Sequence, residues 1–332
     1  PAAIQIGRSQ LAEPAWAKKA KEGRASDIKP CINCLIGCID RGMLSHTPIH
    51  CTVNPSLYRF ECKPVEKAET RKQVAVVGAG PAGCEAALTA SKRGHQVTIY
   101  EKRCIGGAMI EASKPENKAN IKRLIHYYED HIMHDPNITL VKEEVEYETL
   151  VHSGYDAVII AVGGKTRILN VPGIEKNSVI YASDYLNGST AVTGNTVVVI
   201  GGGITGAETA LELNAEGKKV TIVEMTDAFL ANFSSACQAY LATINETDIK
   251  ILTGKRLTAV HENNVILTDR WGNETTVPAD SVVIAAGFTS QNELSDKLEE
   301  NTDMQVFNVG DSKRIRQIYD AIHEGFIAAR QI

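Results

Sequence analysis

Four cysteines are crowded into one short stretch of the chain, with the spacing C-x2-C-x3-C-x12-C. They are Cys31, Cys34, Cys38 and Cys51. Three closely spaced thiolates and a fourth from a nearby loop can ligate a [4Fe–4S] cluster, because such a cluster is held by four cysteine sulfurs. A structural zinc ion is the competing interpretation, although zinc sites commonly carry two separated C-x2-C pairs. The asymmetric spacing favours the iron–sulfur cluster.

The other potential ligands are weaker candidates. Eight cysteines in 332 residues are too few for a disulfide scaffold, and clustered cysteines in a reducing compartment are more often metal ligands. Cys62 is a possible substitute ligand. His46 and His50 could ligate the cluster or donate hydrogen bonds to its sulfurs, but solvated loop histidines are the simpler interpretation. The remaining cysteines are scattered: Cys84, Cys104 and Cys237.

An internal repeat carries a second kind of chemistry. The segment VAVVGAGPAGCEAALTASKRGHQVTIYEK (74–102) aligns without gaps on VVVIGGGITGAETALELNAEGKKVTIVEM (197–225), with 13 identities. Each copy has an apolar strand, a G-x-G-x-x-G loop, an amphipathic helix and a second strand that ends in Glu. The repeat predicts two domains of one βαβ architecture, each able to bind a dinucleotide.

The residue types of the two loops explain this chemistry. The first glycine permits a tight turn, the second lets the backbone approach a pyrophosphate, and the third lets helix and strand pack closely. The terminal Glu accepts hydrogen bonds from ribose hydroxyls. One such loop alone could be a glycine turn of any α/β protein, but each copy here has the full context. The residues are Gly78, Gly80, Gly83 and Glu101 in the first copy, and Gly201, Gly203, Gly206 and Glu224 in the second.

Glu224 bears on the choice of nucleotide. A carboxylate suits a ribose 2′-hydroxyl and repels a 2′-phosphate, for which a site would supply Arg. The residues that follow, MTDAFLA, contain no Arg or Lys, and Lys218 and Lys219 precede the strand. We therefore expect the second loop to bind NAD(H) rather than NADP(H).

The elements that must position these residues follow an α/β pattern from Gln73 to the end of the chain. Before it come a short helical pattern within residues 1–28, a loop-like cysteine segment and a polar linker at 65–72. The net charge of −5 and the lack of a basic tract argue against nucleic-acid binding. No apolar run is long enough to span a bilayer, and no signal sequence is evident. The chain begins at Pro1, which is consistent with processing or with a fragment.

Beyond the loops, three segments resemble the flavin-dependent pyridine-nucleotide oxidoreductases: YDAVIIAVGG (155–164), DSVVIAAGFTSQNEL (280–294) and VFNVGDSKRIRQIYDAIHEGFIAARQI (306–332). The resemblance implies FAD in the first loop and the nicotinamide nucleotide in the second. For FAD it implies Gly78, Gly80, Pro81, Ala82, Gly83, Glu101, Lys102, Gly107, Met109, Val145, Ala161, Val162, Gly163, Gly310 and Asp311. For NAD(H) it implies Gly201, Gly203, Ile204, Thr205, Gly206, Glu224, Ala286 and Gly287.

Two details refine this resemblance. Asp311 would hydrogen-bond the ribityl chain of FAD, and a turn or helix-capping Asp is the alternative. The disulfide reductases of this fold carry a redox cysteine pair beside the flavin, whereas Cys104 has no cysteine within five residues and Cys237 stands alone. Electrons must therefore leave the flavin by another route.

Taken together, the segments resemble the large, multi-cofactor branch of the Old Yellow Enzyme flavoproteins, which includes 2-enoate reductases, 2,4-dienoyl-CoA reductase and trimethylamine dehydrogenase. In that branch an FMN-binding (β/α)8 barrel ends in GR…LA.P.W..KA.EG…DI.PC..C…C, followed by C.VNP. This chain has IGRSQLAEPAWAKKAKEGRASDIKPCINCLIGC and CTVNPSLYRFE. Residues 1–28 resemble only the last βα unit of the barrel, where Gly7 and Arg8 match the FMN-phosphate contact. The resemblance therefore implies an FMN-barrel domain or subunit as electron acceptor.

The resemblance implies that NADH passes a hydride to FAD, which passes single electrons to the cluster and on to FMN, where an activated C=C bond is reduced. No side-chain acid or base is then needed for hydride transfer, and full C=C reduction is not expected of this chain without the barrel. The expected parts are a barrel remnant (1–28), a [4Fe–4S] segment (29–64), a discontinuous FAD domain (65–165 and 285–332) and an NAD(H) domain (166–284). We expect a cytoplasmic oxidoreductase with two Rossmann-like domains, able to form homo-oligomers.

Two other functions fit parts of the pattern. One is a self-contained electron-transfer subunit that resembles the small subunit of glutamate synthase and docks on a partner. The other is a zinc-stabilised nucleotide-binding protein without redox chemistry. The stretch that leads from the Gly-Arg pair into the cysteines favours the barrel-linked enzyme.

Overall fold

The computed structural model describes residues 3–57, 64–231 and 234–332, and the chain divides into two compact units. The first comprises residues 1–165 and 289–332, and the second comprises residues 166–288. The chain crosses between them in β5 (Lys165–Thr166) and β14 (Phe288–Thr289). Within the described ranges no helix combines the length and the apolar character that crossing a membrane requires.

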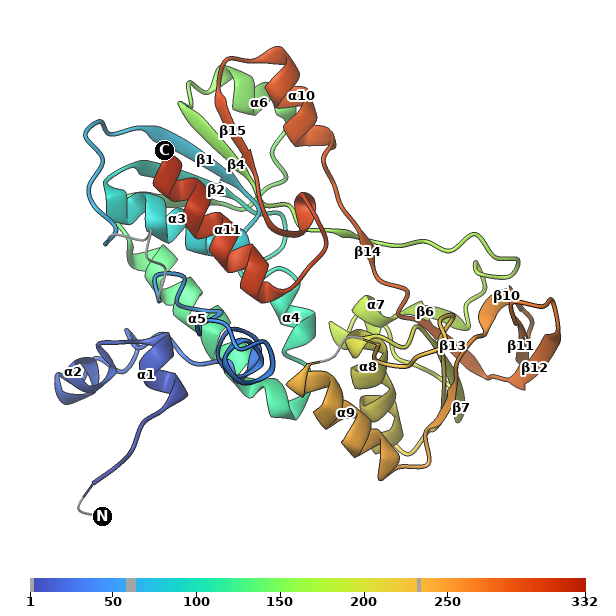
Figure 1. The fold of residues 1–332 in the computed structure, drawn as a ribbon. Coiled ribbons are helices and arrows are strands. Elements are labelled where there is room, and N and C mark those ends of the chain that lie inside the picture. Colours follow the sequence, from blue (N-terminus) through green and yellow to red (C-terminus); the bar gives the residue numbers. More distant parts are fainter. Residues whose placement is uncertain (1–2, 58–63, 232–233) are drawn as a thin grey trace. The chain divides into compact units, whose positions relative to one another are not determined.

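The first unit is built on a parallel sheet of five strands in the order β15-β4-β1-β2-β3 (Figure 1). The strands are β1 (Gln73–Val77), β2 (Gln96–Tyr100), β3 (Ile138–Val141), β4 (Ala157–Ile160) and β15 (Gln305–Asn308). Beyond the exposed Gln73 at its start, the central strand β1 is apolar and buried, because helices cover both faces of the sheet. Val74 and Val76 face one core, while Ala75 and Val77 face the other.

Helices are divided between these two faces. One core joins the sheet to three helices, α3 (Pro81–Arg93), α5 (Ala119–His134) and α11 (Ile318–Gln331). The other core is closed by α6 (Tyr147–His152) and α10 (Glu293–Asn301). Shorter elements lie in the connections: α4 (Met109–Ala112), η2 (Glu116–Lys118) and η3 (Gly310–Ser312). Helix α11 packs along α3, so the last helix of the chain supports the first glycine loop.

The second unit also has a parallel sheet of five strands, in the order β6-β13-β7-β8-β9. Its edge strand β6 precedes the central strand β7 in the chain, whereas β15 follows β1. The strands are β6 (Val179–Tyr181), β7 (Thr196–Ile200), β8 (Lys219–Val223), β9 (Lys250–Leu252) and β13 (Ser281–Ile284). Three helices cover one face: α7 (Ala182–Leu186), α8 (Ile204–Ala215) and α9 (Ser235–Asn245). An antiparallel sheet covers the other: β10 (Arg256–Val260), β11 (Asn264–Thr268) and β12 (Glu274–Pro278). The expected pair of Rossmann-like domains is confirmed.

The segment that precedes the first sheet differs in detail from the sequence expectation. Residues 3–7 form no strand; they lead into α1 (Arg8–Ala12) and α2 (Trp16–Lys21). The cysteine segment is not only loop, because Ile36–Leu44 forms a π-helix, η1. A strand needs a neighbour to bond with, and a π-helix is rare and has no strong sequence period. Neither feature therefore has a recognisable signal in the sequence.

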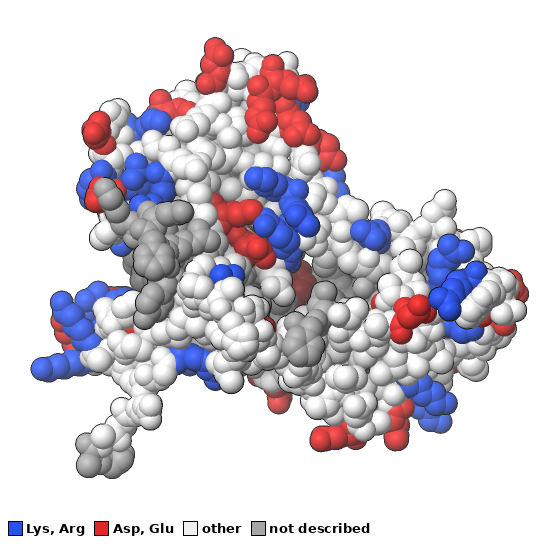
Figure 2. Space-filling view, viewed as in Figure 1, with Lys and Arg blue, Asp and Glu red and all other residues white. Residues whose placement is uncertain are grey.

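Charged side chains are mixed over the surface. On the face in Figure 2, groups of Lys and Arg lie beside groups of Asp and Glu. Several are paired, for example Arg316 with Asp320 and Lys102 with Glu144. This distribution agrees with the absence of a basic tract in the sequence.

Candidate nucleotide loops and cysteine pocket

The first glycine loop joins β1 to α3 in a conformation that only glycine can adopt. Gly78 has φ of 99°, and a Cβ there would lie 2.4 Å from the carbonyl oxygen of Ala161. A Cβ on Gly83 would lie 1.9 Å from the carbonyl oxygen of Gly78. Pro81 opens α3, where its missing N–H costs nothing. The free N–H groups at this helix end suit a phosphate group.

Glu101 is fixed at the end of β2 by the same loop. Its carboxylate accepts hydrogen bonds from the backbone N–H of Ala79 at 2.7 Å and of Arg103 at 2.7 Å. The side chain is buried, with 9% exposed. The carboxylate is therefore held beside the glycine turn, as a ribose-binding group would require.

The second loop reproduces this geometry between β7 and α8. Gly201 has φ of 119°, and a Cβ there would lie 2.3 Å from the carbonyl oxygen of Ala285. A Cβ on Gly206 would lie 1.9 Å from the carbonyl oxygen of Gly201. Around Gly203, in contrast, no described atom other than those of Gly203 and its two chain neighbours lies within 4 Å of the Cβ position. The middle glycine thus leaves open the space through which a pyrophosphate would approach.

Glu224 is held like Glu101, at the end of β8. It accepts hydrogen bonds from the N–H of Gly202 at 2.7 Å, and from the N–H and hydroxyl of Thr226 at 2.7 and 2.8 Å. A cation that the sequence near Glu224 does not reveal lies close by: the guanidinium of Arg270 is 3.5 Å from the carboxylate of Asp227, three residues after Glu224. Arg270 comes from the turn between β11 and β12, so no local pattern near Glu224 could reveal it.

Five further residues predicted for FAD lie just beyond the ends of two strands of the first sheet. Ala161, Val162 and Gly163 follow β4, and Gly310 and Asp311 follow β15. Both strands lie on one side of β1, whereas β2 lies on the other, which makes the end of β1 a topological switch point. Ligands of open α/β sheets bind at such a point.

The other residues predicted to bind FAD differ in their exposure, and the residues predicted to bind NAD(H) lie in the second unit. A Cβ on Gly107 would lie 2.8 Å from Cα of Gly80, so these two turns touch. Met109 and Val145 are buried, whereas Lys102 is exposed and pairs with Glu144 at 2.7 Å. In the second unit, Ile204 and Thr205 open α8, and Ala286 and Gly287 follow β13. Their binding roles stay predictions.

Asp311 lies in the short 3-10 helix η3, which precedes α11. Its Oδ1 accepts the backbone N–H of Arg316 at 2.9 Å, as expected for a turn-stabilising Asp. Burial raises the pKa of this carboxyl above its ordinary value. The turn role is thus present, and a ribityl hydrogen bond stays a prediction.

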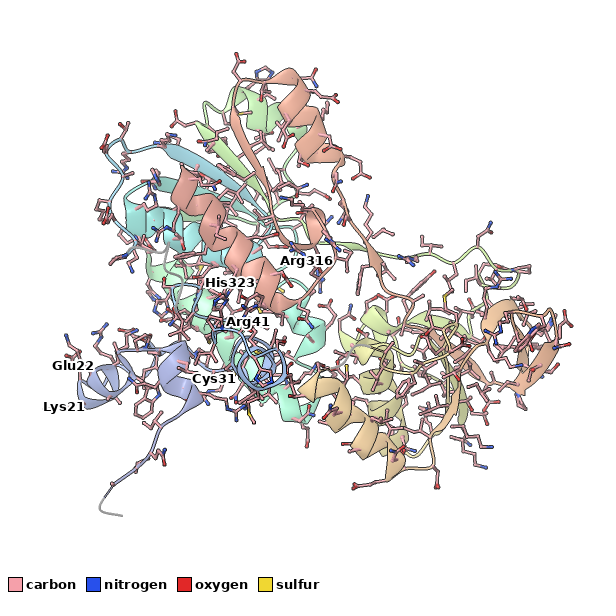
Figure 3. All side chains as sticks on the ribbon, viewed as in Figure 1. Lys21, Glu22, Cys31, Arg41, Arg316 and His323 are labelled. Carbon is pink, nitrogen blue, oxygen red and sulfur yellow. The ribbon has the colours of Figure 1, made fainter. Side chains whose placement is uncertain are left out.

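The four clustered cysteines line one pocket of the first unit. Cys31, Cys34, Cys38 and Cys51 are all partly buried free thiols, and they share the pocket with Arg8, Ile32, Leu35, Gly37, Thr52 and Val53. Of these residues, Cys31 is labelled in Figure 3. Among the described residues, no group of three or more His, Cys, Asp and Glu side chains is spaced to hold a single metal ion. Cys62 lies outside the described residues.

The backbone of this pocket is unusual and brings distant cysteines together. Asn33 and Leu35, two non-glycine residues, have φ of 55° and 63°. Left-handed residues of this kind turn N–H groups toward one concavity, an arrangement common at iron–sulfur sites. The N–H of His50 donates to the Gly37 carbonyl at 2.6 Å, and a Cβ on Gly37 would lie 3.2 Å from Cα of Cys51. Because Gly37 has no side chain, the segment that contains His50 and Cys51 can pack against the loop of residues 31–38.

The thiols are partly buried and lie close to polar groups. Sγ of Cys34 lies 3.0 Å from Oγ1 of Thr52. Burial raises the pKa of Cys51 to about 11, and backbone N–H groups of Val53 and Asn54 oppose this shift. A cluster or metal would displace the proton, because thiolates are the ligating form. Four cysteines, a left-handed loop and N–H groups near the sulfurs fit a [4Fe–4S] cluster.

Gly7 and Arg8 lie at the start of α1, with Gly7 as the residue before the helix. The side chain of Arg8 is among those that line the cysteine pocket. Its predicted contact to an FMN phosphate concerns a group outside this chain and stays a prediction.

Comparison with known proteins agrees with this geometry. The family model "Pyridine nucleotide-disulphide oxidoreductase" matches residues 72–325. The chain is 36% identical to an NADH oxidase of Thermoanaerobacter brockii, over 99% of the chain and 52% of the relative. It is 31% identical to a cinnamate reductase of Clostridium sporogenes, over 99% of the chain and 49% of the relative.

A solved structure of a 2-naphthoyl-CoA reductase in complex with 2-naphthoyl-CoA matches with a TM-score of 0.89 at 30% identity, covering 98% of this chain and 50% of that one. The chain thus spans about half the length of the relatives it matches. The resemblance stated from the sequence is confirmed: the chain belongs to the flavin-dependent pyridine nucleotide-disulphide oxidoreductase family and is related to NADH oxidase and enoate reductases.

Proposed function

We propose that this chain is the NADH-oxidising part of a multi-cofactor flavoenzyme. NADH bound at the second glycine loop would deliver a hydride to FAD bound at the first, and single electrons would then pass to a [4Fe–4S] cluster held by Cys31, Cys34, Cys38 and Cys51. The cofactors supply the redox chemistry, and the protein supplies position and electrostatics. The observation that carries this proposal is the lining of one pocket by all four cysteines, in the same compact unit as the first glycine loop.

The residues of the chain have defined tasks in this proposal. The amino ends of α3 and α8 would hold the two pyrophosphates, while Glu101 and Glu224 would accept hydrogen bonds from ribose hydroxyls. Asp311 would orient the ribityl chain. The four thiolates and the N–H groups around them would hold the cluster and tune its potential.

The final electron acceptor would be an FMN barrel, as a further domain or as a separate subunit. Relatives that are about twice as long, one of them named a cinnamate reductase, support this part of the proposal. An unsaturated acid or thioester would then be the substrate class of the complete enzyme. A self-contained electron-transfer subunit is the alternative arrangement of the same module.

The test is an anaerobic titration of the purified chain with NADH and, separately, with NADPH. Flavin absorbance, the EPR spectrum of the reduced cluster, and the iron and flavin contents are measured together. We expect about four iron atoms per chain, as a [4Fe–4S] cluster contains, and NADH should bleach the flavin and then produce the EPR signal. Protein that contains zinc and no iron would overturn the cluster assignment, and a preference for NADPH would overturn the role of Glu224.

A further inference from the structure

We propose that two buried polar contacts clamp the cysteine segment to the helices that frame the first glycine loop. Lys29 and Glu85 form the first clamp, at the start of the segment, and His323 and Cys51 form the second, at its end. Glu85 and His323 are then positioning residues for electron transfer between flavin and cluster. This inference rests on the proposed function and names residues outside the predicted cofactor ligands.

The first clamp is an ion pair that joins the segment to α3. Nζ of Lys29 lies 2.5 Å from Oε2 of Glu85, and both side chains are nearly buried, with 11% and 9% exposed. The hydroxyl of Tyr128, on α5, donates to the same carboxylate oxygen at 2.8 Å. The ammonium also lies over the rings of Tyr127 and Tyr128, at 5.7 and 5.3 Å from their centroids. Lys29 is two residues from Cys31, so this contact fixes where the cysteine loop begins.

The second clamp is a hydrogen bond that joins the segment to α11. Nε2 of His323 donates to the backbone carbonyl of Cys51 at 2.9 Å, and His323 is 3% exposed. His323 on α11 is labelled in Figure 3. Its ring stacks on Tyr319, one turn earlier, with centroids 4.1 Å apart. The hydroxyl of Tyr319 in turn lies 2.7 Å from Nδ1 of His50. The last of the four cysteines is therefore held by two successive turns of one helix.

The two helices that carry the clamps are themselves locked together at the first glycine loop. A Cβ on Gly325 of α11 would lie 2.1 Å from the carbonyl oxygen of Ala82, the second residue of α3. A Cβ on Gly310 would lie 3.1 Å from Cβ of Ala82. Both clamps thus fix the position of the cysteine pocket relative to the amino end of α3, where the FAD pyrophosphate is predicted to bind. A shift of either contact would change the flavin-to-cluster geometry.

Buried polar contacts of this kind act strongly when one partner is lost. Removing one member of a buried ion pair leaves the other as an unpaired buried charge, which is unfavourable. Groups that orient metal ligands without touching the metal typically change metal retention by about 10-fold to 100-fold. Changes of this size in metal retention can be measured when either contact is removed.

The experiment compares conservative and disruptive variants of the full chain. Lys29→Met removes the charge of the first clamp, whereas Lys29→Arg retains it. His323→Phe keeps an aromatic ring against Tyr319 but loses the donor, whereas His323→Gln keeps a donor. Three properties are measured: the rate of iron loss to a chelator, the EPR spectrum of the reduced cluster, and the rates of flavin and cluster reduction by NADH.

We expect Lys29→Met and His323→Phe to lose iron about tenfold faster than the unmodified chain and to alter the EPR spectrum. Flavin reduction by NADH should be unchanged, while cluster reduction should be slower. Lys29→Arg and His323→Gln should remain close to the unmodified chain. Two variants serve as matched controls: Lys19→Met, which breaks the Lys19–Glu13 ion pair of the same 2.5 Å length, and Phe326→Leu, in the buried face of α11.

The outcomes separate this inference from the proposed function. If the unmodified chain holds no iron, or if NADH does not reduce its cluster, the proposed function fails. If it does both, and Lys29→Met and His323→Phe match it in iron loss, EPR spectrum and cluster reduction, the clamp inference fails. If His323→Gln loses iron as fast as His323→Phe, the hydrogen bond to Cys51 is not the contact that positions the cysteine loop. Flavin content measured in each variant shows that the FAD unit is still folded.

Discussion

At the scale of single residues, the cysteines show what their spacing in the sequence can predict and what it cannot. The spacing predicted that Cys31, Cys34, Cys38 and Cys51 act together, and the structure lines one pocket with all four. Spacing could not show that Thr52 lies beside Cys34 or that His323 bonds to Cys51, because these contacts join residues distant in sequence. Such contacts depend on the tertiary structure.

The cysteine assignment predicts a selective loss. Cys34→Ser should reduce the iron content of anaerobically purified protein to near zero, because three thiolates leave one corner of the cluster without its sulfur ligand. FAD content should be unchanged, since the first glycine loop is not touched. Iron and flavin analyses measure the two quantities in one sample.

The control for this experiment is Cys104→Ser, which changes an exposed thiol outside the pocket. It should retain iron and flavin at the level of the unmodified chain. Equal iron in Cys34→Ser and in Cys104→Ser would contradict the assignment of Cys34.

Glu224 makes the second prediction at this scale. In Glu224→Gln the side chain keeps its size but loses its charge, and a hydrogen bond to a charged group contributes about 1.5–3 kcal/mol. We expect KM for NADH to rise about tenfold or more and the discrimination against NADPH to fall. Steady-state kinetics with both nucleotides measure this change.

Glu101→Gln is the matched control, because Glu101 has the same place in the first loop. It should lower FAD content and leave the NADH-to-NADPH preference unchanged. A preference that stays the same in Glu224→Gln would show that another group selects the nucleotide.

At the scale of elements, the two βαβ units were predictable because their signals are local. The strands read as apolar runs, the loops as glycine patterns, and the helices as the segments between them. The π-helix Ile36–Leu44 was not predictable in this way, since its form depends on left-handed residues at Asn33 and Leu35 and on the contact of Gly37 with the segment that contains Cys51. The local sequence gives no period that distinguishes it from a loop.

The second glycine loop predicts opposite effects for two glycines that are three residues apart. Gly206→Ala places a Cβ 1.9 Å from the Gly201 carbonyl oxygen, so we expect a loss of about 1–3 kcal/mol in the free energy of unfolding. Gly203→Ala adds a Cβ that meets no described atom within 4 Å beyond its own chain neighbours, and Gly203 has an ordinary φ of −80°. It should fold normally but lose NADH affinity, because the methyl group occupies the path of the pyrophosphate.

Urea unfolding and NADH fluorescence titration of both variants check these expectations. Normal NADH affinity in a well-folded Gly203→Ala variant would show that the pyrophosphate does not bind at this loop.

At the scale of the whole molecule, residues 166–288 form a continuous unit inserted into the first one. The two ends of this unit are adjacent, because the N–H of Arg167 donates to the Gly287 carbonyl at 3.0 Å. Adjacent ends allow a domain to be excised. We expect residues 166–288 to fold alone and to bind NADH within about tenfold of the affinity of the full chain, which corresponds to 1.4 kcal/mol.

Circular dichroism and NADH titration of the excised unit measure its folding and binding. The same unit with Gly203→Ala is the control and should fold without binding NADH. An excised unit that is unfolded would show that its stability depends on the rest of the chain.

The stability of the first unit should also depend on pH through His95. Burial lowers the pKa of His95, and the N–H of Lys72 donates to its Nδ1, so the folded state holds the ring neutral. The unfolded chain takes up a proton below about pH 6.5, while the folded chain resists this uptake. Stability is therefore unaffected above that pH and falls as the pH drops from about 6.5 through the lowered pKa.

His95→Gln should flatten this part of the stability profile, measured by urea unfolding between pH 7 and 5. His126→Gln, which alters an exposed histidine of the same unit, is measured beside it for comparison. An unaltered profile in His95→Gln would show that another group causes the pH dependence.

The sequence by itself determined the fold class, the repeated nucleotide loops, the family resemblance and the cysteines that belong together. These features are encoded in types and spacings over at most a few tens of residues, because a glycine turn or a ligand set tolerates few substitutes. Only the tertiary structure decided how the cysteine segment is positioned against the helices of the first unit. Lys29 meets Glu85, and Cys51 meets His323, across long separations in the chain, and the packing of α3, α5 and α11 on one face of the sheet brings them together.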